Sequence, residues 1–132
     1  MQEAFKPLED QVLISNRLID VRGQLAGVIW FDFLKICDGP RSQNDYIEIA
    51  EQFGTVLISG VPQFSVATED QARRFISLVD EFYDRKVKLI VSAEASISKL
   101  YHGRRVRFEF ERTMSRLLEM QSDAYLGLQH RA

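Results

Sequence analysis

The chain has 132 residues, of which 45% are hydrophobic and 27% are charged, and its formal net charge is -2. This length suits one domain that buries roughly two thirds of the surface of its unfolded chain. The nearly balanced charge argues against a general polyanion binder but leaves local basic patches open, and we expect no nucleic-acid partner. No stretch approaches the ~20 consecutive apolar residues that cross a bilayer, so we expect no membrane insertion.

The N-terminal residues lack the marks of a targeting segment. Residues 1–7 have neither a basic start with an apolar run nor an Arg-rich, acid-poor composition. Cys37 is the one cysteine, so no internal disulfide can form, which fits a reducing compartment. We therefore expect a cytoplasmic protein whose residues 1–11 are poorly ordered.

The first third of the chain has strand character. Three runs are rich in β-branched and aromatic residues, and turn residues separate them. The runs are 12–15, 18–22 and 28–33. Together they predict a small antiparallel β-meander.

A short helix and a buried strand follow this meander. Ser42 stands three residues before Asp45, an N-cap pattern, and apolar residues at helical spacing come after it. We predict a helix over 42–54. The β-branched run 55–59 is too short for a typical helix and predicts a central strand.

The clearest helix signal lies in the middle of the chain. Thr68 and Gln71 have the spacing of a capping box, and apolar residues follow at spacings of three and four. These apolar residues are Ala72, Phe75, Ile76, Val79, Phe82 and Tyr83. A strand-like run follows at 87–93. Residues 55–93 therefore predict a βαβ unit with parallel strands and a right-handed crossover.

The last third predicts a long terminal helix. Apolar residues from Phe110 to Leu128 recur on one helical face, with a break near Ser122. The expected fold is α/β, with a small sheet, the parallel βαβ unit of residues 55–93, the N-terminal antiparallel meander and flanking helices. One domain is expected to span residues 1–132.

No catalytic or metal-ligating constellation stands out. His102, His130 and Cys37 are scattered singly, so we expect no metal site. No serine or cysteine lies in a GxSxG-type turn, and the neighbouring carboxylates of Asp80 and Glu81 point apart on a helix. We therefore expect no catalytic residue in this chain.

Two interpretations of Arg73 and Arg74 stay open. They can pair with Glu69 and Asp70 one turn earlier, which stabilises a helix by roughly a few tenths of a kcal/mol. Alternatively, one of them faces a phosphate, because a guanidinium makes bidentate contacts and is always charged. The densest basic run, 104–116, is interrupted by acidic residues, which favours a solvated helix face over a nucleic-acid groove.

Six sequence blocks carry a family resemblance. They are, in chain order, Trp30 to Cys37, Pro40 to Ile47, Thr55 to Pro62, Ala72 to Ile76, Leu78 to Tyr83 and Phe108 to Ser122. From Leu13 onward the chain resembles the C-terminal portion of the ZapE-type AAA+ ATPases, a bacterial cell-division group with mitochondrial Afg-like relatives. The resemblance covers nearly the whole chain.

The resemblance implies properties of the complete protein. Such a protein is expected to use ATP and Mg, to form a homo-oligomer and to act in cell division through the tubulin-like ring protein FtsZ. The family's phosphate loop and acidic Mg-coordinating strand lie upstream of this region, and no GxxxxGK[ST] loop replaces them here. We therefore expect a region that is not catalytic by itself, binds no cofactor alone and partners its own N-terminal ATPase half or full-length subunits.

The resemblance also suggests roles for individual residues. Ser59 to Pro62 end the strand that carries an acidic pair in a generic AAA+ core, so no carboxylate is available there for Mg. Ser92 and Glu94 would end a sensor-like strand. The candidates for contact with ATP, in the complete protein only, are Arg73, Arg74, Arg112 and Arg116. Of these, Arg112 and Arg116 occupy the place of a subunit-spanning arginine.

An alternative function belongs to a different class. The chain can be a free-standing interaction module that modulates complete ATPase oligomers or binds the family's partner. An exposed apolar patch favours this alternative.

Overall fold

The computed structural model describes residues 11–132. The expected poor order of residues 1–11 therefore concerns a segment outside the described residues, except for Gln11, the first residue of a strand. None of the helices in the described part of the chain has the length and apolar character needed to cross a bilayer.

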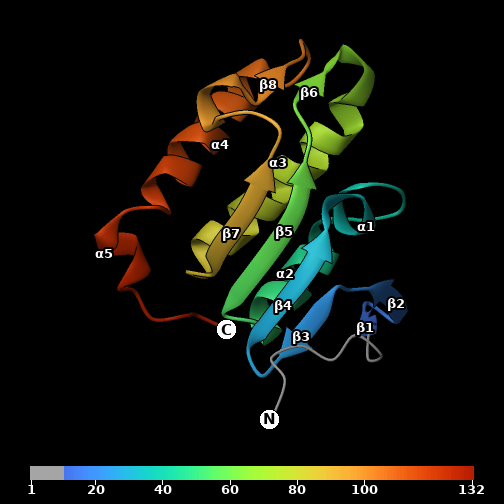
Figure 1. Ribbon diagram of the computed structural model, residues 1–132, viewed down its shortest axis with the longest axis vertical. Helices are drawn as coiled ribbons and strands as arrows, with labels where there is room; N and C mark the ends of the chain where they lie inside the picture. Colours follow the sequence, from blue (N-terminus) through green and yellow to red (C-terminus); the bar gives the residue numbers. More distant parts are fainter. Residues whose placement is uncertain (1–10) are drawn as a thin grey trace.

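A four-stranded mixed sheet forms the centre of the structure (Figure 1). Its strands lie in the order β3 (Gly23–Leu25), β4 (Val28–Asp32), β5 (Thr55–Val61) and β7 (Lys88–Ala93). β3 is antiparallel to β4, whereas β4, β5 and β7 are parallel to one another. The predicted α/β class and the parallel pairing of the βαβ unit are confirmed.

The N-terminal strands divide between two sheets. β1 (Gln11–Ile14) and β2 (Arg17–Asp20) form an antiparallel hairpin of their own, whose turn places Ser15 and Asn16 at positive φ. The antiparallel character is confirmed, but the third expected strand, β4, joins the main sheet beside β5 instead of extending a meander. Apolar runs predict that a strand is buried and do not specify its partner.

The described residues 11–132 also form five α-helices and two 3₁₀ turns. They are α1 (Phe33–Cys37), α2 (Gln43–Gln52), α3 (Glu69–Asp84), α4 (Arg107–Glu119), α5 (Asp123–Leu126), η1 (Val66–Thr68) and η2 (Ile97–Lys99). In Figure 1, α2 and α3 lie behind the strands, while α4 and α5 lie beside β7. β6 (Phe64–Ser65) and β8 (Tyr101–His102) form a short parallel pair. β6 precedes α3 and β8 precedes α4 in the chain, so the pair connects the segments that lead into these two helices.

Aromatic side chains fill the core between the sheet, α3 and α4. The ring of Phe64 lies 5.7 Å from Phe33, 5.6 Å from Phe75 and 5.7 Å from Phe110, measured between centroids. All four side chains are buried. Tilted pairs of this kind stabilise a core by about 0.5–1.5 kcal/mol beyond the area they bury.

The start of α3 differs in detail from the predicted capping box. The Thr68 hydroxyl accepts the N–H of Ser65 at 2.9 Å, and the Ser65 hydroxyl accepts the N–H of Ala67 at 3.2 Å. Thr68 makes no side-chain cap bond to α3, so the predicted pairing with Gln71 is wrong. The residue pattern correctly predicted the start of a helical segment. The Thr68 hydroxyl, however, bonds to Ser65 at the start of η1 and not to the backbone of α3.

The predicted break near Ser122 is confirmed. The Ser122 hydroxyl donates to the carbonyl of Glu119 at 2.7 Å and accepts the N–H of Tyr125 at 3.1 Å. The same side chain therefore ends α4 and begins α5. The Tyr125 hydroxyl then donates to the carbonyl of Val87 at 2.7 Å, which attaches α5 to the sheet.

Cys37 is fully buried at the end of α1, as expected for a core residue. Burial raises the pKa of its thiol to about 12, and the Tyr46 hydroxyl lies 3.9 Å from its sulfur. Tyr46 itself donates to the carbonyl of Ile36 at 2.6 Å. These contacts join α1 to α2.

Candidate functional site

Asp80 on α3 holds two of the four candidate arginines. Its carboxylate pairs with the guanidinium of Arg116, and Arg112 Nη2 lies 3.6 Å from Asp80 Oδ2. The Arg116 guanidinium also lies 4.9 Å from the centroid of the Tyr83 ring. The side chain of Arg116 is 26% exposed and that of Arg112 is 58% exposed. Arg116 is thus fixed in the α3–α4 contact, whereas Arg112 extends into solvent.

Tyr83 extends this contact. Its hydroxyl donates to Glu119 at 2.8 Å, and this bond to the carboxylate raises the pKa of Tyr83. The Tyr83 ring is stacked on Tyr125 at 5.9 Å between centroids. The carboxylates of Asp80 and Glu119 and the Tyr83 ring therefore form one polar and aromatic network between α3, α4 and α5.

Arg73 lines a surface pocket of about 280 Å³ near Asp80. The remaining lining residues are Gln43, Ile76, Ser77, Asp80, Glu81, Val106 and Glu109. Three carboxylates beside one guanidinium do not suit a triphosphate, because the carboxylates repel the negatively charged phosphates. This chain alone therefore does not form an ATP site in this pocket.

Arg74 lies on another side of α3. Its charge acts on Cys37 and Tyr46, the two buried groups whose pKa values are raised mainly by burial. No ion pair of Arg73 or Arg74 occurs in residues 11–132, so the pairing with Glu69 and Asp70 is not found. The structure thus brings Arg73, Arg112 and Arg116 to one region around Asp80 and leaves Arg74 apart.

Glu69, on the first turn of α3, makes polar contacts that its sequence pattern does not predict. Its buried carboxylate accepts the Tyr101 hydroxyl at 2.5 Å and the N–H groups of Arg104 and Arg105 at 2.6 and 2.9 Å. The Tyr101 bond, followed by these amides, lowers the pKa of Glu69 to about 2. We call these residues, together with Gly103, the Glu69 clamp.

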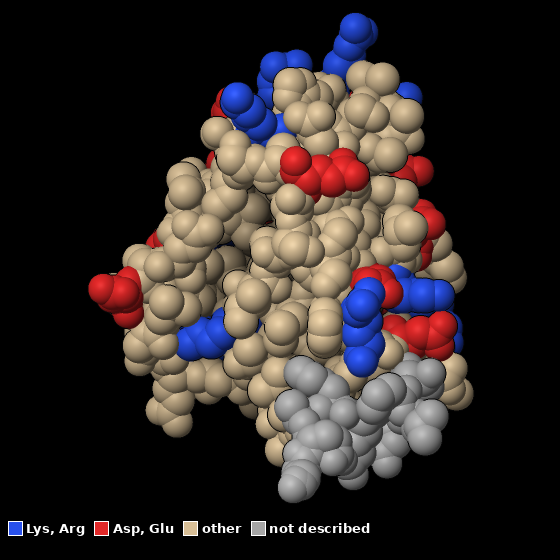
Figure 2. Space-filling model, in the orientation of Figure 1, with Lys and Arg blue, Asp and Glu red and all other residues tan. Residues whose placement is uncertain are grey.

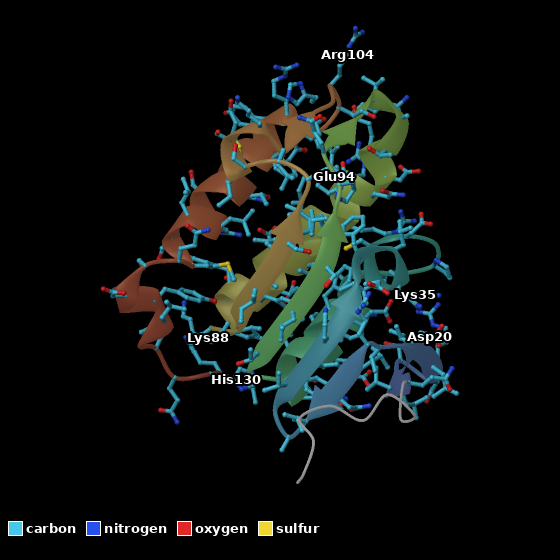
Figure 3. The ribbon with its side chains drawn as sticks, viewed as in Figure 1. Asp20, Lys35, Lys88, Glu94, Arg104 and His130 are labelled. Atoms are coloured by element: carbon cyan, nitrogen blue, oxygen red, sulfur yellow. The ribbon has the colours of Figure 1, made fainter. Side chains whose placement is uncertain are left out.

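Gly103 is required for the Glu69 clamp to close. A Cβ at this position would lie 2.5 Å from both Glu69 Oε1 and the Tyr101 hydroxyl. The clamp fixes the backbone before α4, and the side chains of Arg104 and Arg105 are exposed at the tip of the molecule, where Figure 3 labels Arg104. Sequence spacing gave no sign of this contact, because its partners are more than 30 residues apart.

Ser92 and Glu94, at the end of the expected sensor-like strand, bind the backbone of the neighbouring segment. The Ser92 hydroxyl accepts the N–H of Gly60 at 3.0 Å, and Glu94 accepts the N–H of Gln63 at 2.9 Å. The register between β5 and β7 shifts between Ile58 and Val61, next to these bonds. Both side chains therefore stabilise the irregular end of β5.

A groove of about 870 Å³ lies between β7 and α4, and Figure 2 shows the hollow. Its lining is largely apolar or neutral, and comprises Val91, Ala93, Ala95, Ser96, Ile97, Ser98, Glu111, Met114, Ser115, Leu118 and Gln121. Within residues 11–132 no three His, Cys, Asp or Glu side chains gather as metal ligands. With this largely apolar lining, the groove has the character of an apolar contact surface.

Comparisons with known proteins identify related chains. The model of the AFG1-like ATPase family matches residues 1–129. Cell division protein ZapE of Escherichia coli strain K12 is 45% identical over 119 residues, which are 90% of this chain and 32% of ZapE. Lactation elevated protein 1 homolog B of Danio rerio is 34% identical, over 70% of this chain and 25% of that protein.

The chain thus spans about a third or less of the length of these relatives. No solved structure gives a significant match. The family model covers nearly the whole sequence. The chain belongs to the AFG1-like ATPase family.

Proposed function

We propose that this chain acts as the C-terminal region of a ZapE-like, ATP-hydrolysing AAA+ protein in cell division, and that it is not catalytic by itself. The observation that supports this most is the 45% identity to E. coli ZapE over 90% of the chain, which is only 32% of ZapE. The rest of the protein would supply the nucleotide site.

The division of labour follows from the chemistry of phosphoryl transfer. Catalysis of ATP hydrolysis needs backbone amides and a lysine around the phosphates, and Mg to neutralise the developing charge. The sequence has no GxxxxGK[ST] loop, and the pocket beside Arg73 carries three carboxylates. In our proposal ATP and Mg therefore bind outside this chain, which contributes packing and contacts between subunits.

The proposed partners are the protein's own N-terminal ATPase half or full-length subunits. By resemblance, the complete protein would be a cytoplasmic homo-oligomer that acts with FtsZ. Arg73, Arg74, Arg112 and Arg116 would contact ATP only in that assembly. Arg73 and Arg74 form no ion pair within residues 11–132, whereas Arg116 is held by Asp80 and the Tyr83 ring, so these two are better candidates than Arg116 for a phosphate that another part of the assembly binds.

A chimera tests this proposal. The region of E. coli ZapE that matches this chain is replaced by residues 11–129, and ATP hydrolysis is measured for the chimera, for intact ZapE and for the isolated chain. We expect hydrolysis by the chimera and ZapE, and none by the isolated chain. A folded chimera that neither binds nor hydrolyses ATP would contradict the proposal, as would hydrolysis by the isolated chain.

The groove beside β7 favours the alternative of a free-standing interaction module, because it exposes apolar surface. This alternative predicts that the isolated chain binds complete ZapE oligomers and changes their rate of ATP hydrolysis. A mixing experiment with separately purified chain and intact ZapE separates the two functions.

A further inference from the structure

β7 is an edge strand with a free side. It pairs with β5 alone in the sheet. The N–H of Lys88 donates to Gly54 at 2.8 Å and that of Glu94 donates to Val61 at 2.9 Å, so both face β5. Alternate amides of a strand point to opposite sides. The amides of the odd-numbered residues 89, 91 and 93 therefore face away from β5, and no partner for them occurs among residues 11–132.

The two edges of the sheet differ in how they resist further pairing. Natural edge strands are kept from pairing by short length, charged side chains or proline. The opposite edge, β3, has three residues. β7 has six, and its residues 89–93 include no charge and no proline. Ile90 and Val91 in this strand are 56% and 38% exposed. The β7 edge is thus open to an additional strand.

The groove lies along the free edge of β7, between this strand and α4. Val91 and Ala93 form one wall, and Met114 and Leu118 of α4 form the other. Because α4 lies alongside β7 in Figure 1, pairing of two β7 edges from two copies would bring their α4 helices together. A single strand avoids this obstacle, and its alternate side chains can meet the apolar walls.

We propose that β7 pairs with an extended, largely apolar strand from the part of the ATPase that lies outside this match, and that this strand fills the groove between β7 and α4. This inference rests on the proposed function. About two thirds of ZapE lies outside the matched region, since the match is 32% of its length. A strand in the same polypeptide meets the groove at an effective concentration on the order of millimolar, which favours it over a separate molecule.

Amide hydrogen exchange tests the pairing residue by residue. Exchange is measured by NMR in the isolated chain and in the ZapE chimera described above. We expect the amides of Leu89, Val91 and Ala93 to exchange about a hundredfold or more slowly in the chimera, because each gains a hydrogen-bond acceptor. The amide of Ile90, which faces β5, is the internal control and should be protected in both proteins.

A matched pair of substitutions tests the groove. Leu118 lies in the groove and is 59% exposed, whereas Leu34 on α1 lies outside it and is 58% exposed. We expect neither Leu118→Glu nor Leu34→Glu to change the Tm of the isolated chain appreciably. In the chimera, Leu118→Glu should restore fast exchange at Val91, and Leu34→Glu should not. Retained protection at Val91 in Leu118→Glu would overturn the inference.

The possible results separate this inference from the proposed function. A chimera that hydrolyses ATP with unchanged exchange at 89, 91 and 93 would overturn the added strand and leave the proposed function intact. An inactive chimera with protected amides would support the strand and contradict the function. If the chimera fails to fold, exchange at the aligned positions of intact ZapE gives the deciding measurement, since fast exchange there overturns the inference.

Discussion

The hydroxyl of Tyr101 donates a 2.5 Å hydrogen bond to the buried carboxylate of Glu69, which stands 32 residues earlier in the chain. The same carboxylate accepts two backbone N–H groups from the loop before α4. One side chain on the first turn of α3 therefore determines where α4 begins. Charge-assisted bonds of this kind are about twice as strong as bonds between neutral groups.

The close approach at Gly103 predicts a sensitive position. We expect Gly103→Ala to lower the free energy of unfolding by about 1–3 kcal/mol, because the new Cβ overlaps Glu69 and Tyr101. Urea denaturation followed by circular dichroism measures the change. Gly127→Ala is the control, since its Cβ meets no atom closer than 3.5 Å. Equal stability of Gly103→Ala and the wild type would show that the clamp is not tightly packed.

The lowered pKa of Glu69 predicts a loss of stability in acid. The pKa is about 2 in the folded protein, below the usual 4.5, so the unfolded chain takes up a proton at a higher pH. The contribution of the carboxylate is therefore complete above about pH 5 and is lost as the pH falls toward 2. We expect the free energy of unfolding to fall less steeply across this range in Glu69→Gln. Asp70→Asn, at the exposed neighbouring carboxylate, is the matched control variant.

The two arginines that pair with Asp80 should differ in their effect on stability. Arg116→Ala should cost about 1–2 kcal/mol, because it removes a partly buried ion pair and the contact with the Tyr83 ring. Arg112→Ala should cost less than about 1 kcal/mol, because this side chain is exposed. A double-mutant cycle with Asp80→Ala gives the coupling energy of each pair. Equal costs for the two arginines would contradict this assignment.

The proposed phosphate contacts of Arg73 and Arg74 require the complete protein. In the ZapE chimera, we expect Arg73→Ala or Arg74→Ala to lower kcat for ATP hydrolysis about a hundredfold or more, as loss of a guanidinium that stabilises the transferred phosphoryl group does. Lys99→Ala, which removes an exposed positive charge elsewhere on the chain, is the control. Unchanged kcat in both arginine variants would leave these residues with a role in stability or solubility alone.

Local patterns in the sequence predicted several helices and strands, although β3 forms where a turn was expected and the short helix α1 was not predicted. The helices α2 and α3, the parallel strands β5 and β7, and the break at Ser122 all follow from apolar periodicity and from residues that begin or end helices. These signals depend on neighbours within a few positions, so they can be read from a single chain.

Contacts between distant segments could not be predicted in the same way. The partner of β4, the parallel pair β6 and β8 and the Glu69 clamp join residues that are many positions apart. The interpretation of Arg73 as a partner of Glu69 failed because that carboxylate binds Tyr101 and the loop before α4 instead. For Arg116, the contact with Asp80 on another helix had no local signal.

The buried thiol of Cys37 provides a direct measure of how often the folded chain opens around it. Because burial raises the pKa of this thiol to about 12, very little of it is ionised at pH 8, and alkylating reagents react with the thiolate. Because the chain has a single cysteine, the rate of its alkylation measures how often the structure around Cys37 opens. This rate can be followed by mass spectrometry in any of the variants above without introducing a label.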